Sequence, residues 1–218
     1  MKVGFSVRVR VLALGLTAGV ALALQPSLSG QGKPFVRVTE EQGRAAMDTA
    51  LKASKDNELT VRNTFQREIR KIWSDYENKP VPVYERTELN ISVAGPAQMM
   101  VGTVVDLVIM SQPIGKLVWT PGVSVSINPQ NENAPDIVKV VVTRAGADVP
   151  PIGQNLSIRN FKPVQGVVGG RTTAVHQGAV IFPSSAFEPG APVKVEAVQA
   201  SGKSFSRTLN DSDLKKIQ

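Results

Sequence analysis

The sequence has no cysteine and only one histidine, His176, among its 218 residues. The absence of cysteine excludes disulfide bonds, thiol nucleophiles, iron–sulfur clusters and every zinc site that uses cysteine. A single histidine also excludes the multi-histidine sites that hold zinc or copper. His176 lies in a predicted strand with no nucleophile motif nearby, so we predict no triad chemistry, no cofactor and no metal.

No apolar run reaches the roughly 20 residues that a membrane-spanning helix needs. The longest, VLALGLTAGVALAL at residues 11–24, follows a segment with three bases and no acid, and it contains the small-x-small triplet Ala21-Leu22-Ala23. This order is typical of a secretory signal peptide. We therefore predict a signal peptide over residues 1–23 and, after its cleavage, a soluble exported chain without a membrane span, periplasmic or extracellular. An uncleaved anchor is the alternative, and the lack of cysteine favours a bacterial envelope.

The excess of basic residues is small once the signal peptide is removed. The whole chain has 25 Lys and Arg against 18 Asp and Glu, and loss of three bases lowers the net charge from +7 to +4 (22 against 18). One basic cluster, Arg67, Arg70 and Lys71, lies on a predicted helix whose aromatic residues belong to its apolar face, so nucleic-acid binding is not expected. Gly202-Lys203-Ser204 resembles the end of a phosphate-binding loop, but Ala197 stands where glycine is needed, so we predict no nucleotide site.

The sequence predicts a helical segment after a flexible lead over residues 24–38. Residues 39–79 contain no proline and are rich in Ala, Glu, Lys, Arg and Gln, which favours helix. Thr39 and Gln42 match a capping box at its start, and we predict that Asp56 caps a second helix after a break. Apolar residues on this second helix recur at steps of three and four, which makes one stripe: Val61, Phe65, Ile69, Ile72, Trp73 and Tyr76.

From residue 80 onward, valine dominates the apolar residues and alternates with polar ones, as in Val123-Ser-Val-Ser-Ile127. We predict strands near residues 85–94, 103–111, 116–120, 123–128, 137–144, 155–161, 172–183, 192–199 and 203–209, and a last helical turn near 212–217. Residues 178–209 resemble the last three strands of bacterial immunoglobulin-like and fibronectin-like sandwiches, without the cysteine pair of antibody domains. The predicted fold is mainly β: an antiparallel immunoglobulin-like β-sandwich over residues 80–218, preceded by the amphipathic helical segment, α+β overall.

The predicted strand at residues 103–111 is largely apolar on both faces and is interrupted by Asp106. A sandwich strand with one solvated face should be polar on that face. We therefore predict that the helical segment packs across the outside of the sheet and that Asp106 is a buried polar residue; a face open to a partner is the rival interpretation.

These observations favour an exported, non-catalytic binding or assembly module of the cell envelope or extracellular space, whose partner is a protein or an envelope polymer. The residues predicted to face that partner are Arg67, Arg70 and Lys71, together with Arg171 after a glycine-rich segment. Two alternatives stay open: a secreted glycan hydrolase that uses paired carboxylates, and a structural protein that oligomerises through its helix. The ligand and the oligomeric state are also left open.

Overall fold

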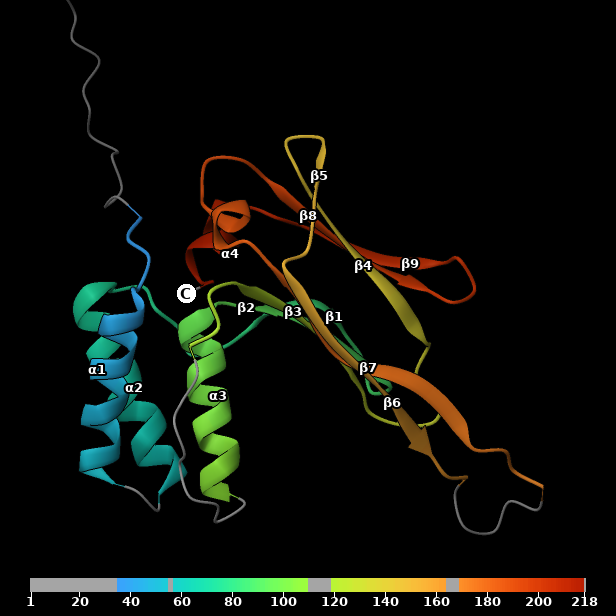
Figure 1. Cartoon of the computed structure of the whole chain (residues 1–218), viewed down its shortest axis with the longest axis horizontal. Coiled ribbons are helices and arrows are strands. Elements are labelled where there is room, and N and C mark those ends of the chain that lie inside the picture. The colour runs from blue at the N-terminus through green and yellow to red at the C-terminus, as the bar shows by residue number, and fades with distance from the viewer. Residues whose placement is uncertain (1–34, 55–56, 110–118, 164–168, 218) are drawn as a thin grey trace, which may run out of the picture. The chain divides into compact units, whose positions relative to one another are not determined.

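The computed structural model describes residues 35–54, 57–109, 119–163 and 169–217. The predicted signal peptide over residues 1–23 and the first part of the predicted lead lie outside these residues. The described residues are mainly β: nine strands form two antiparallel sheets, and four α-helices accompany them (Figure 1). Among these helices, none combines the length and the hydrophobicity needed to cross a bilayer.

Three helices form the N-terminal part of this fold. The first, α1 (Glu40–Ala53), begins at the predicted capping box: Thr39 Oγ1 accepts from the Gln42 amide at 3.3 Å, and Gln42 Oε1 accepts from the Thr39 amide at 3.0 Å. The second, α2 (Glu58–Ile72), is capped by Asn57, whose Oδ1 accepts from the Thr60 amide at 2.9 Å; the predicted cap, Asp56, lies outside the described residues. The third, α3 (Pro96–Ile109), begins with proline, which suits the first helical position because its missing N–H would have no partner there.

The strands follow most of the predicted positions. The five-stranded sheet has the order β1-β2-β3-β7-β6 and the four-stranded sheet has the order β5-β4-β8-β9. The bounds are β1 (Val81–Glu85), β2 (Leu89–Ala94), β3 (Val123–Pro129), β4 (Ile137–Arg144), β5 (Ala147–Val149), β6 (Gly153–Phe161), β7 (Thr173–Phe182), β8 (Val193–Gln199) and β9 (Ser204–Leu209). A short 3-10 helix (Ser184–Phe187) and α4 (Asp211–Lys215) complete the chain.

The two sheets share one hydrophobic core. Alternate residues of β3, Val123, Val125 and Ile127, are buried with Val193 and Val195 of β8 in the other sheet. Each such side chain contributes roughly 1.5–3 kcal/mol when it leaves water, so the alternation fixes which face of each strand turns inward. The serines between them, Ser124 and Ser126, lie on the opposite face of the five-stranded sheet.

A second hydrophobic cluster lies among the three helices. It includes Met47 of α1, Val61 and Phe65 of α2, and Val101 and Val104 of α3, and it contains no strand residue. The stripe on α2 therefore packs against its neighbouring helices, whereas the sequence analysis predicted that it would pack across the outside of the sheet.

The predicted strand at residues 103–111 is wrong, because this stretch belongs to α3 as far as Ile109. Its buried residues recur with helical spacing (Ala97, Met100, Val101, Val104 and Val105) and face the helical cluster. Asp106 lies on the exposed side of the helix and is not a buried polar residue. Three smaller differences concern the strands: β1 and β2 replace the single strand predicted at residues 85–94, β5 was not predicted, and the described part of residues 116–120 (Trp119 and Thr120) forms no strand.

Candidate functional site

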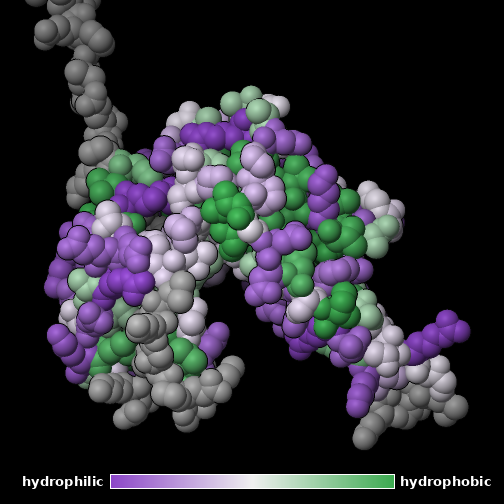
Figure 2. All heavy atoms as spheres, viewed as in Figure 1, coloured by the Kyte–Doolittle hydropathy of each residue, from purple (hydrophilic) through white to green (hydrophobic). Residues whose placement is uncertain are grey.

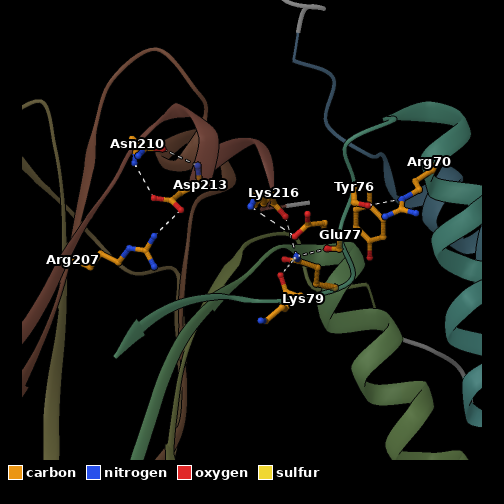
Figure 3. Close-up of polar contacts among 9 residues, drawn as sticks. Arg70, Tyr76, Glu77, Lys79, Arg207, Asn210, Asp213 and Lys216 are labelled. Atoms are coloured by element: carbon orange, nitrogen blue, oxygen red, sulfur yellow. Dashed lines mark hydrogen bonds and ion pairs between the residues drawn. The ribbon is translucent and has the colours of Figure 1, made fainter. Parts of the chain in front are cut away.

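The three basic residues predicted on the helix all lie on α2, and each has a partner. Glu68 is ion-paired with Arg67 at 3.4 Å and with Lys71 at shorter range. The hydrogen bond from Lys71, assisted by the charges of both bases, holds the pKa of Glu68 below its ordinary value. Arg70 Nε donates to the Tyr76 carbonyl at 2.9 Å, which ties the end of α2 to the segment that follows it (Figure 3). These residues therefore support the helix locally as well as facing solvent.

The fourth predicted residue, Arg171, lies apart from this cluster. It is exposed and comes just before β7, in the connection between β6 and β7. In Figure 1 the first residues of β7 lie at the opposite end of the view from α2. The predicted basic residues therefore do not form one surface.

The apolar stripe on α2 is an internal feature. Val61, Phe65 and Ile69 are fully buried, and Tyr76, just after the helix, is fully buried too. Trp73 is 5% exposed and Ile72 is half-buried against the same cluster. Burial raises the pKa of the Tyr76 phenol, because the negative charge of the phenolate would form inside the cluster, away from water. No large part of the stripe is left for a second chain.

Among the described residues, the polar side chain with the most hydrogen-bond contacts is Gln98, which the sequence analysis did not single out. It stands in the first turn of α3, is 4% exposed, and its Oε1 accepts from the Gly95 amide at 2.8 Å. Its Nε2 lies 2.9 Å from each of three carbonyl oxygens, those of Glu77, Lys79 and Lys216. Figure 3 shows how the two backbone segments that carry these carbonyls, the connection before β1 and the end of the chain, converge. Gln98 thus ties α3 to both segments.

A small charged pocket of about 210 Å³ lies beside this junction. Its carboxylates are Glu77 and Asp213, so this is the place to look for the paired acids of a glycan hydrolase. Asp213 accepts from Arg207 Nη2 at 2.8 Å and also completes the capping box of α4, while Glu77 lies 3.8 Å from the Lys216 ammonium (Figure 3). Because each acid already has a basic partner, the pocket gives the hydrolase alternative no support.

The only histidine pairs with an acid that the sequence did not assign to it. His176 Nδ1 and the His176 backbone amide both lie 2.8 Å from Asp136 Oδ1. Asp136 precedes β4 and His176 lies in β7, so the pair joins the two sheets. Among the described residues, the hydrogen-bond partner of the His176 side chain is Asp136, and no serine contacts this histidine. No cluster of three metal-binding side chains occurs in the described part either.

The outer face of the five-stranded sheet carries a shallow trough of about 430 Å³. It crosses three neighbouring strands, β3, β7 and β6, on the face opposite the shared core. Its lining contains hydroxyl and carboxamide side chains and no ionisable one: Ser126, Asn128, Asn155, Ser157 and Gln177, with Ile127, Gly178 and Ala179 between them. The sequence analysis missed this site, because polar residues on alternate positions of a strand are the ordinary signature of a solvated face.

The edge of the same sheet at β6 is open. This strand is nine residues long, contains no proline, and among the described strands pairs with β7 alone. The other edges are shorter or interrupted: β5 has three residues before Pro150 and Pro151, and β1 contains Pro82 beside a break in its register. The edges at β1 and β9 are also joined, because Arg207 Nη1 donates to the Pro82 carbonyl at 2.5 Å. Among the described strands, β6 is therefore the edge with the least protection against pairing.

Apolar side chains accompany this open edge. Ile152, just before β6, is 56% exposed, and Ile158 within it is 52% exposed. On the face shown in Figure 2, hydrophobic surface recurs along the strands, whereas hydrophilic residues dominate the helical part. Comparison of the chain with protein-family models, with curated proteins and with solved structures found no match, so the open edge and the trough are the features from which a function has to be argued.

Proposed function

We propose that this chain is an exported, non-catalytic binding or assembly module of the cell envelope or extracellular space. In this proposal its two sheets form an immunoglobulin-like sandwich that presents an edge to a protein partner. The proposal is supported by a core built from both sheets, and by the pairing of Asp136 with His176 and of Asp213 with Arg207.

The observation that carries the proposal is the open edge of β6. An unpaired edge strand offers a row of backbone N–H and C=O groups, and proteins use such rows to bind an extended segment of a partner. Natural sheets usually block long edges with proline, with inward-pointing charges or with a covering loop. Here Arg159 is the one charged side chain in nine residues, and Ile158 adds an exposed apolar contact beside it.

The test is a cross-linked pull-down of the tagged mature chain from its native envelope, washed at low and at high salt. We expect a stoichiometric protein partner that survives high salt, because backbone hydrogen bonds and apolar contacts are little screened by ions. The variant Ile158→Lys places a second charge on the edge and should abolish recovery of that partner. Val138→Lys is the matched control, because Val138 is 44% exposed on β4, a strand paired on both sides.

Equal recovery of the partner by both variants would contradict the proposal that the partner binds at the β6 edge. Recovery only of an anionic polymer, lost as salt rises, would move the interaction to exposed basic residues such as Arg67 and Lys71. An empty pull-down would count against the proposed function as a whole.

Export is tested separately by the intact mass of the chain isolated from the envelope fraction. Cleavage near Ala23 should give a mature chain that begins close to Leu24. A full-length mass in the membrane fraction would indicate the uncleaved anchor.

A further inference from the structure

The trough on the five-stranded sheet owes its shape to the middle strand. Along β7 its floor is made by Gly178, which has no side chain, and Ala179, which has only a methyl group. Ser126 of β3 and Asn155 of β6 stand on either side of Ala179 in register. The two flanking strands therefore form walls around a floor of small residues.

The strands also diverge at this point. The pairing of β3 with β7 ends at Ile127 opposite Gly178, whereas the pairing of β6 with β7 continues as far as Phe161 opposite Thr173. Gly178 has a φ of +126°, and a Cβ built there would lie 1.9 Å from the Asn155 carbonyl oxygen. Only glycine fits this close approach without strain, so the hollow depends on a specific residue and is more than a gap between side chains.

The chemistry of the lining is uniform. All its polar side chains are hydroxyls or carboxamides, which can both donate and accept hydrogen bonds. The side chains of Asn155, Ser157 and Gln177 make no hydrogen bond to any described residue, so their donors and acceptors are free for a ligand. This neutrality contrasts with a chain in which 20% of residues are charged.

One charged residue borders the trough but is already engaged. Arg159 follows Ser157 by two positions on the same face of β6, its Nη1 donates to the Pro129 carbonyl at 3.0 Å, and its guanidinium lies 4.6 Å from the centre of the Phe161 ring. These contacts hold the arginine beside the trough and leave the lining itself without charge.

We propose that the trough binds a neutral, polyhydroxylated ligand, namely an uncharged oligosaccharide. Sugar hydroxyls donate and accept hydrogen bonds as the free carboxamides and hydroxyls of the lining do, and burial of a charged ligand here would lack a counter-charge. The volume of about 430 Å³ lies in the range of small-molecule sites, roughly 300–1,000 Å³. This site goes beyond the proposed function, because it uses side chains on the sheet face and not the backbone of the edge.

The test is titration of the isotope-labelled mature chain, followed by amide NMR shifts, with neutral tetrasaccharides of glucose and of N-acetylglucosamine. A sulfated oligosaccharide serves as the anionic comparison. We expect shifts on β3, β6 and β7 around the trough with the neutral sugars, and an affinity that changes less than about twofold between low and high salt.

Two variants on the trough, one on β6 and one on β7, have matched carboxamide controls on β6. Asn155→Ala and Gln177→Ala should each weaken binding about tenfold, the equivalent of about 1.4 kcal/mol. Asn160→Ala and Gln154→Ala remove exposed carboxamides from the opposite face of β6 and should leave the affinity unchanged. Absence of shifts with every neutral sugar would overturn the proposal. Binding of the sulfated sugar alone, or equal losses of sugar affinity in the trough variants and the control variants, would also overturn it.

Discussion

Replacement of Gln98 by methionine should destabilise the protein through the loss of one amide side chain. Methionine has a similar length but removes the acceptor for the Gly95 amide and the donors to three carbonyls. The bond to Gly95 is buried, and its loss leaves an N–H without a partner, at a cost of about 1–3 kcal/mol. The amide has two hydrogens for the other three contacts, which together contribute about 1–3 kcal/mol.

The expected loss is therefore about 4 kcal/mol, a large part of the roughly 5–15 kcal/mol that stabilises a typical domain. Urea unfolding followed by circular dichroism measures this loss. With a slope of about 2 kcal/mol per M, the midpoint should fall by about 2 M. Gln154→Met is the control, because Gln154 is exposed and makes no hydrogen bond through its side chain in the described part. A midpoint for Gln98→Met within about 0.3 M of the parent would refute the reasoning.

A second substitution at the same position separates donors from acceptor. Gln98→Glu keeps an oxygen for the Gly95 amide but presents a carboxylate to three carbonyl oxygens. Burial and these oxygens should raise the pKa of the introduced carboxyl group above its unfolded value of about 4.3. The loss of stability caused by the buried carboxylate is then complete above the pKa that this group has in the folded state. It fades as pH falls toward the pKa of the group in the unfolded state. We expect Gln98→Glu to be less stable than Gln98→Met at pH 7 and to approach it in acid; a gap independent of pH would contradict this account.

Three further predictions concern the cluster among the helices and the trough. Phe65→Ala should cost about 3–5 kcal/mol in urea unfolding, because Phe65 is fully buried among the helices; a loss below about 1 kcal/mol would contradict this packing. Gly178→Ala should cost about 2–4 kcal/mol, from its positive φ and the clash with Asn155, while Gly153→Ala, with open space around its Cβ, should stay within about 0.5 kcal/mol of the parent. For Tyr76, the raised pKa keeps the folded phenol protonated while the unfolded phenol ionises above pH 10, so stability should fall with rising pH there. Tyr76→Phe should make that fall shallower by up to about 1.4 kcal/mol per pH unit, and identical slopes would argue against a buried phenol.

The sequence analysis correctly predicted the parts of the fold that depend on residues close together in the chain. The capping box at Thr39 and Gln42 starts α1 as expected, and the alternation at residues 123–127 lies in β3. Asn210 and Asp213 complete a second capping box at α4, close to the predicted last turn. Each of these depends on residues within a few positions of one another, so a single sequence contains enough information to place them.

The sequence analysis was wrong or incomplete where contacts between distant parts of the chain determine the structure. The valines of α3 have an intrinsic preference for strand. Because apolar residues occur on both sides of this segment, the helical spacing that begins at Ala97 was not recognised. Three of these residues, Met100, Val104 and Val105, are buried by neighbouring helices, which a sequence pattern cannot reveal. Gln98 was missed for the same reason: its partner Lys216 lies 118 residues away along the chain. The trough was missed because its hollow depends on Gly178 approaching Asn155 across two strands.

The two proposed surfaces meet on one strand, and their separation follows from the pleat of β6. Asn155 and Ser157 line the trough, while Leu156 packs toward the shared core, with Ile158 two positions further on the same side. The backbone between them forms the open edge of the sheet. A partner strand added at this edge would lie beside Asn155 and Ser157 and place its own alternate side chains along the open side of the trough. Protein binding at the edge should therefore change sugar affinity in the trough, whereas Ile158→Lys, which alters the opposite face, should change sugar affinity little in the absence of the partner.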